Sequence, residues 1–256
     1  MNISGLELSL LAPAFLAGLL VLMSHVPLGM QVLARGIVFI DLAIAQIAGL
    51  GVIIADQLGF QAQGIGVQLS AVSAALLGAL WLTYSEKRWP EVQEALIGVL
   101  FVLAATGSVL LLAHDAHGGE HLKDLLVGQI LWVSYAQLPV AAVVSFVVIA
   151  LWFTQRQRIG VLGFYVLFAF AVTASVQLVG IYLVFASLIV PAMATRHYQP
   201  KRRLFFAYVN GVAAYALGLL ASAWWDLPAG AVIVWAMVVI GLVVYGLGPR
   251  RNTLLA

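Results

Sequence analysis

Long apolar stretches follow one another along almost the whole chain, separated by short polar segments. Uncharged stretches occupy residues 8–34, 57–85, 95–114, 125–155, 159–195, 204–225 and 227–249, and a further one at residues 36–58 contains only Asp41 and Asp56 as charged residues. A helix needs about 20 apolar residues to cross about 30 Å of hydrocarbon. The apolar residues do not alternate with polar ones as they would in a membrane β-barrel. The pattern therefore predicts an all-α fold, a polytopic transmembrane helical bundle.

Two of these stretches do not fit one straight helix each. Residues 159–195 make a run of 37 residues, and Gly180 marks the expected turn within it because glycine permits backbone angles that end a helix. Within residues 125–155 we expect a short helix over 125–134, a break near Ser134 and a crossing over 138–153. Interrupted membrane helices usually border a cavity. The chain should thus make about eight to nine membrane crossings, with one or two broken helices, as a single domain over residues 1–256.

The composition agrees with this reading and narrows the function. Hydrophobic residues make up 64% of the chain and charged residues 9%, whereas soluble domains carry about 25% charged residues. The chain has no cysteine, which excludes disulfides and thiolate metal sites. It has no glycine-rich phosphate loop followed by Lys-Ser or Lys-Thr and no pattern typical of a catalytic triad. We expect a transport protein without its own ATPase site, catalytic residues or intrinsic cofactor.

The basic residues predict the orientation. In a nine-crossing order, eleven of the twelve Lys and Arg residues fall on one side of the membrane, and Lys123 alone falls on the other. Cytoplasmic segments of membrane proteins carry this excess of positive charge. The expected topology has the N-terminus outside and the C-terminus in the cytoplasm.

Asp41 is the first candidate for a functional residue. It lies with the amide of Gln46 in the otherwise apolar segment RGIVFIDLAIAQIAGLG, which runs from Arg35 to Gly51. A charged side chain near the bilayer centre costs at least about 2.5–3.5 kcal/mol, so such residues usually face a cavity or a transport path. The alternative is that Asp41 lies near a helix end and contacts headgroups, water or Arg35.

A second candidate is the external segment HDAHGGEHLKD, residues 114–124. It contains His114, His117 and His121 together with three carboxylates, and a Gly-Gly pair that would let its halves fold together. Neutral imidazole and carboxylate suit Zn²⁺, and also Mn²⁺ or Fe²⁺ with more oxygen ligands. The segment is predicted to gather or release metal at the outer mouth, or else it is a solvated polar loop.

The third candidate lies in the cytoplasmic stretch GIYLVFASLIVPAMATRHYQPKRR. An apolar run there meets Pro191, then Ala192 and Ala194, then Arg196 and a basic cluster at residues 201–203. Proline fits the first turn of a helix but not its interior, so Pro191 should start or kink a helix. This predicts a short helix at the cytoplasmic face that is available to a partner. The alternative is an ordinary basic loop that only sets the topology.

Three segments, in this order, resemble the permease subunit of the ATP-binding-cassette importers for zinc, manganese or iron. They are VLARGIVFIDLAIAQIAGLG, then EALIGVLFVLAA with LKDLLVGQILWVS, and finally VGIYLVFASLIVPAMATR. The last is similar to the family stretch G-x-L-L-V-x-A-L-L-I-x-P-A-A-x-A-R and is the most specific. The matches extend from about residue 30 to about residue 200.

The resemblance implies a bacterial inner-membrane permease that imports a divalent metal ion, with zinc favoured over manganese or iron. It implies a homodimer or a pair of permeases, two cytoplasmic ATPase subunits and an external metal-binding protein. The family aspartate matches Asp41, and Pro191, Ala192, Ala194 and Arg196 match the stretch that contacts the ATPase.

The chain departs from the family pattern at the histidine of the motif G-D-A-L-S-H. This histidine falls at Ala45, or at Gln46 if one residue is inserted. Gln46 lies about 140° around an ideal helix from Asp41, so the two share a face only if the helix is distorted. The external histidines would then take a larger share of metal binding. A permease for a metal chelate and a stand-alone secondary transporter remain the alternative functions.

Overall fold

The protein is a bundle of α-helices. The computed structural model describes residues 5–61, 64–115, 118–155 and 158–249, without the side chains of residues 5–9 and 121. These residues contain no β-strand. The helices are α1 (Gly5–Arg35), α2 (Ile40–Gln57), α3 (Ile65–Arg88), α4 (Gln93–Leu112), α5 (Gly118–Val127), α6 (Leu138–Gln155), α7 (Val161–Val179), α8 (Ile181–Ala194), α9 (Pro200–Trp225) and α10 (Ala229–Leu247), with short 3-10 helices η1 (Pro90–Val92) and η2 (Ile130–Trp132).

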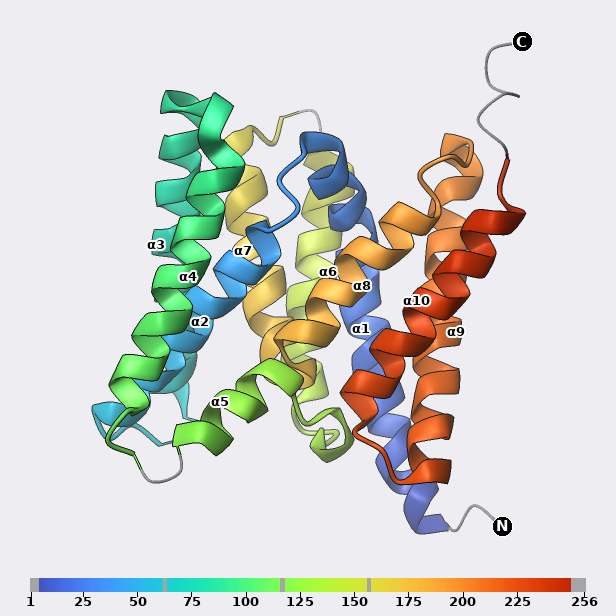
Figure 1. The fold of residues 1–256 in the computed structure, drawn as a ribbon, viewed down its shortest axis with the longest axis horizontal. Helices are drawn as coiled ribbons and strands as arrows, with labels where there is room; N and C mark the ends of the chain where they lie inside the picture. The colour runs from blue at the N-terminus through green and yellow to red at the C-terminus, as the bar shows by residue number, and fades with distance from the viewer. Residues whose placement is uncertain (1–4, 62–63, 116–117, 156–157, 250–256) are drawn as a thin grey trace.

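Eight of the described helices, all except α5 and α8, are long and apolar enough to cross a membrane. When α8 is counted as a crossing and α5 is left out, successive helices run in alternating directions, and the first and last described residues lie at opposite ends of the bundle (Figure 1). Opposite ends require an odd number of passages, and α8 supplies the ninth. Its 14 residues rise only about 21 Å, less than the thickness of the hydrocarbon core. The predicted fold class is confirmed.

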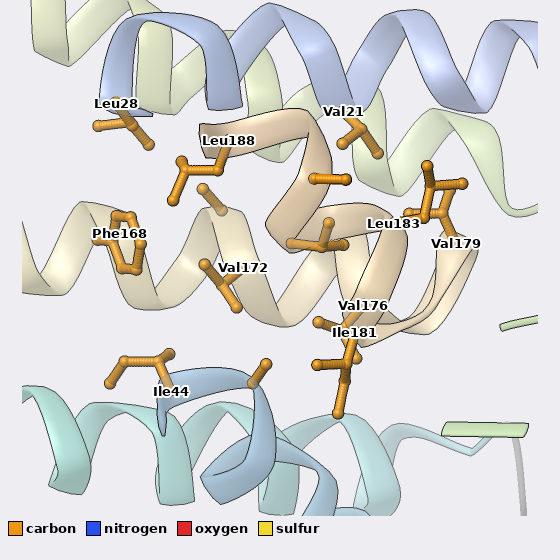
Figure 2. Packing of buried hydrophobic residues seen from close by; sticks show 14 of the residues in the cluster. Val21, Leu28, Ile44, Phe168, Val172, Val176, Val179, Ile181, Leu183 and Leu188 are labelled. Atoms are coloured by element: carbon orange, nitrogen blue, oxygen red, sulfur yellow. The ribbon is translucent and has the colours of Figure 1, made fainter. Parts of the chain in front are cut away.

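The short helix α8 lies at the centre of the bundle. More than half of the residues in the spanning windows of α1, α2 and α7 are buried, whereas only 22% of those in the windows of α4 and α10 are. Figure 2 shows side chains of α1, α7, α8 and α2 meeting in one apolar core, among them Val21, Leu28, Phe168, Val172, Leu183, Leu188 and Ile44. The outer faces of α4 and α10 are apolar and exposed, as expected for surfaces that meet lipid or another protein.

The break predicted at Gly180 is confirmed. Helix α7 ends at Val179 and α8 begins at Ile181, with Gly180 between them at φ 81°. Gly128, which follows α5, has φ 71°, and a Cβ atom on either glycine would overlap the backbone of the other segment. The backbone after α5 is therefore in direct contact with the backbone between α7 and α8. This contact joins α5 to the junction of α7 and α8.

The predictions for residues 114–134 need correction. Residues 118–127 form helix α5, so most of the segment expected to be an external loop is helical from Gly118 onward. The helix predicted over 125–134 is interrupted, because Gly128 takes a positive φ and only the 3-10 turn of η2 follows it. The break before the next crossing is confirmed, since α6 begins at Leu138.

The prediction for Pro191 also needs correction. Pro191 lies inside α8, which ends three residues later at Ala194, so no separate helix begins at this proline. The hydroxyl of Thr195 donates a hydrogen bond of 2.7 Å to the carbonyl oxygen of Pro191. The backbone N–H of Thr195 bonds to the same oxygen at 3.3 Å, so residue 195 closes the last turn of α8. A turn through residues 195–199 then leads directly into α9.

Charge divides between the two ends of the bundle. The described basic residues other than Lys123 lie at the end where the described chain finishes, at the helix ends around residues 35, 88, 158 and 196–203. Asp56, Asp124 and Asp226 lie at the opposite end with Lys123. We call these the basic end and the acidic end. The grouping predicted from the sequence is thus present in the fold.

Candidate functional site

Asp41 lies in the first turn of α2 and is completely buried. Neither carboxylate oxygen has a hydrogen-bond partner among the described residues. A buried carboxylate is costly unless a counter-charge or hydrogen bonds compensate it. The partial positive charge at the start of α2 offsets part of this cost. A cation that reached Asp41 would therefore not have to displace a bond between its oxygens and a described residue.

Arg35, the alternative partner considered for Asp41, is engaged elsewhere. Its guanidinium lies 3.7 Å from a carboxylate oxygen of Glu86 on α3 and 4.4 Å from the ring centroid of Phe164 on α7. Both interactions stabilise a guanidinium at the basic end of the bundle. Since Asp41 is also fully buried, headgroups and bulk water are not its partners either.

The start of α2 is held by a residue from another helix. Phe39 stands at the N-cap position and has no side-chain cap to offer, although Ser, Thr, Asp or Asn are preferred there. Instead, the N–H of Phe39 donates a hydrogen bond of 3.2 Å to the carboxylate of Glu94, near the start of α4. The carboxylate of Glu94 thus caps the helix that carries Asp41.

The start of α4 is itself fixed by a buried polar network. The side-chain N–H₂ of Gln93 donates bonds of 3.1 Å to the carbonyl oxygen of Leu82 and to the hydroxyl of Tyr165. The hydroxyl of Ser85 donates a bond of 2.9 Å to the side-chain oxygen of Gln93. Hydrogen bonds in such a dry setting are strong and hold their members in one arrangement. The network joins α3, α4 and α7 beside Glu94.

The structure does not place Gln46 on the same side of α2 as Asp41. Helix α2 is α-helical without interruption from Ile40 to Gln57. The five-residue offset then separates the two side chains by about 140° around the axis. Gln46 is buried with 7% exposure, and Ala45, at the family histidine position, is fully buried.

The three histidines of the external segment are only partly described. His114 is exposed just beyond the end of α4. His117 lies outside the described residues, and the side chain of His121 on α5 is not described either. The described residues contain no group of three or more His, Asp or Glu that could hold a metal ion. The proposed external metal site therefore stays a prediction.

A cavity of about 400 Å³ lies at the acidic end. Its polar lining comes from two carboxylates and three carboxamides, those of Asp56, Asp124, Gln129, Gln137 and Gln177. The C-terminal ends of α2, α5 and α7 also border it, and helix C-termini carry partial negative charge. The cavity is therefore suited to attract cations at this end of the bundle.

The residues matched to the ATPase-contacting stretch divide into buried and exposed groups. Pro191, Ala192 and Ala194 are buried against other helices of the chain. Arg196 is exposed, and its guanidinium lies 5.3 Å from the ring centroid of Tyr245 on α10. In this conformation, Arg196 is the member of the set that is accessible to another protein.

Glu94 and the polar lining of the cavity at the acidic end are not apparent as functional from the sequence. Glu94 and Phe39 lie 55 positions apart, and no local pattern joins them. For the cavity the sequence does carry a signal, because Asp56 and Asp124 both lie at the ends of spans on the side opposite most of the basic residues. His25 on α1 is fully buried, with Nδ1 3.0 Å from the carbonyl oxygen of Val21.

Comparisons with known proteins give one consistent result. The family model described as "ABC 3 transport family" matches residues 7–164 and 158–247. A protein of Haemophilus influenzae described as "Probable iron transport system membrane protein" is 25% identical over 193 residues, covering 67% of this chain and 70% of that protein. The solved structure "PsaBC from Streptococcus pneumoniae in complex with Fab" is similar with a TM-score of 0.75 and 22% identity, covering 97% of this chain and 94% of that chain.

Proposed function

Because the chain belongs to the ABC 3 transport family, we propose that it is the permease subunit of an importer for a divalent metal ion. The family resemblance inferred from three sequence segments is confirmed by this match. The observation that carries the proposal is Asp41, a fully buried carboxylate in a membrane helix that has no hydrogen-bond partner among the described residues. The description of the Haemophilus influenzae relative as an iron transport protein supports a metal cargo.

In the proposed mechanism, Asp41 is a transient ligand that offsets the charge of a passing ion. A carboxylate offers two oxygens, whereas a resident zinc site usually holds the ion with four ligands. Conduction requires a site attractive enough to admit the ion and weak enough to release it. A path with few protein ligands at Asp41 meets that requirement better than a closed tetrahedral site.

Zinc is the proposed cargo ahead of manganese and iron. The support is the density of imidazole in residues 114–121, since neutral histidine suits zinc among these ions. The carboxylate of Asp41 and the cavity at the acidic end accept any of the three. The choice of metal therefore depends on the external histidines in this proposal.

The proposed assembly contains a second permease, cytoplasmic ATPase subunits and an external metal-binding protein. The basic end would face the cytoplasm, following the rule that positive charge stays inside. Arg196 is exposed at that end, next to the turn between α8 and α9, where an ATPase subunit would bind. ATP hydrolysis there would switch the path between outward-open and inward-open states. The permease itself contributes no ATPase site.

The test is metal uptake by vesicles that contain this chain and its co-purified ATPase. We expect ATP-dependent accumulation of zinc, with manganese and iron(II) competing less effectively than unlabelled zinc. A non-hydrolysable ATP analogue should abolish accumulation. Uptake by the permease alone at the full rate would instead indicate a secondary transporter, and uptake of only a chelated metal would indicate a chelate permease.

The cavity at the acidic end gives a further expected result. Replacing both Asp56 and Asp124 with Asn should raise the half-saturating metal concentration about threefold or more, with little change in the maximum rate. The reason is that surface carboxylates raise the local cation concentration, an effect that salt screens. The difference from wild type should shrink at high ionic strength. Asp226→Asn is the matched control, because this exposed aspartate lies at the same end but does not line the cavity. An unchanged half-saturating concentration in the double variant would contradict the role of the cavity.

A further inference from the structure

We infer that Glu94 is a positioning residue for Asp41: by capping α2 from α4, it sets where the Asp41 carboxylate lies. This inference rests on the proposed function, since it concerns the geometry of the proposed metal ligand. It assigns no metal contact to Glu94. Its basis is the hydrogen bond between the carboxylate of Glu94 and the N–H of Phe39, two residues before Asp41.

The start of α2 has no other side-chain restraint of this kind. The first N–H groups of a helix have no partner within it, and a side-chain oxygen normally satisfies one of them. Phe39 has no such oxygen, and it is half exposed at 49%. The preceding turn is loosely packed at Gly36, where an added Cβ would meet no atom within 4 Å. Glu94 does not bind these first N–H groups but the N–H of the N-cap residue Phe39 itself, as the Glu of a capping box does, and so it ties the entry of α2 to α4.

Glu94 can perform this role because its own position is fixed. The neighbouring residue Gln93 is 4% exposed and bonded to Leu82, Ser85 and Tyr165. These bonds hold the first turn of α4 against α3 and α7. The carboxylate of Glu94 lies on that turn, so its position is fixed by the packing of α3, α4 and α7. Its bond to Phe39 in turn restrains the start of α2.

Asp41 depends on this restraint more than an ordinary buried residue would. Neither of its oxygens bonds to a described group, so no hydrogen bond of its own holds the carboxylate in place. Its position follows from the first turn of α2 and from apolar packing. Partners that orient a metal ligand commonly change metal affinity by 10–100-fold when removed. We expect metal affinity at Asp41 to depend in the same way on Glu94, which acts through the backbone of the first turn of α2.

The test compares Glu94→Ala with Glu94→Gln in the complete transporter. Glutamine keeps a side-chain oxygen that accepts the Phe39 N–H bond but removes the charge. Glu94→Ala should raise the half-saturating metal concentration for uptake about tenfold, while assembly with the ATPase and maximum ATP hydrolysis stay within about twofold of wild type. Glu94→Gln should restore the half-saturating concentration to near the wild-type value.

Each outcome separates this inference from its alternatives. If Glu94→Gln is as impaired as Glu94→Ala, the charge matters and Glu94 acts as a metal contact, which overturns the positioning role. If both variants match wild type, the cap has no bearing on Asp41 and the inference is also wrong. Glu91→Ala, an exposed carboxylate three residues earlier, is the matched control and should be silent. Failure of the wild-type complex to transport metal would instead reject the proposed function.

Discussion

Asp41→Asn is expected to abolish most metal uptake while leaving the protein folded. Asparagine has the same shape but no charge, so it cannot compensate the charge of a divalent ion. We expect uptake to fall at least about tenfold, equivalent to about 1.4 kcal/mol. Thermal stability of the purified protein should be unchanged or higher, because a neutral amide is less costly to bury than an unpaired carboxylate. Uptake into vesicles and the unfolding temperature in detergent measure the two effects.

Opposite changes in transport and stability would distinguish a functional carboxylate from a structural one. A structural carboxylate stabilises the fold, so its loss lowers stability and activity together. Asp41→Glu provides the second variant, since it keeps the charge in a displaced position and should retain part of the uptake. Normal uptake in Asp41→Asn would remove Asp41 from the proposed path. A clear loss of stability in that variant would show that the carboxylate has a partner in the folded protein.

Gly180→Ala should be among the most destabilising single substitutions in the chain. Gly180 has φ 81° and ψ 164°, a region that only glycine adopts readily, and this alone costs about 1–3 kcal/mol for another residue. The new methyl group would also overlap the backbone at Gly128, and overpacking typically costs a further 1–3 kcal/mol. We expect a total of about 2–6 kcal/mol, seen as a low yield of folded protein and a lowered unfolding temperature.

Gly59→Ala is the matched control for this prediction. Gly59 also has φ 81°, but a Cβ atom there would meet nothing within 4 Å. Only the conformational cost of the left-handed backbone applies, about 1–2 kcal/mol. If Gly180→Ala and Gly59→Ala destabilise equally, the contact between the two glycine segments contributes nothing. Gly128→Ala should resemble Gly180→Ala, because its methyl group would overlap the backbone of Val179.

The spanning helices were predictable because hydrocarbon permits few structures. Every backbone polar group in lipid needs an internal partner, so an apolar run of sufficient length becomes a helix. The length of an apolar run also located the break at Gly180, since 37 residues exceed one crossing. The length of apolar runs did not predict α5, because its segment contains His, Glu, Lys and Asp, which are typical of a solvated loop. Helix α5 is amphipathic and ten residues long, too short to give a membrane signal.

The candidate site was predictable only in part. Asp41 stands out in the sequence because a carboxylate is rare in an apolar segment. Its lack of partners could not be predicted, because this depends on Arg35 pairing with Glu86 instead. The cap from Glu94 depends on two residues 55 positions apart, which are brought together by the packing of α2 against α4. Pro191 was expected to start or kink a helix, and it starts none, because it lies within α8.

The shortness of α8 bears on how the centre of the bundle is filled. At 14 residues, this central helix covers only about two thirds of a bilayer's oily interior. The remaining length of about 9 Å has to be filled by other parts of the protein. Helix α5, which contacts α8, is one of these parts, so the shortness of the central helix gives a short amphipathic helix a place inside the bundle.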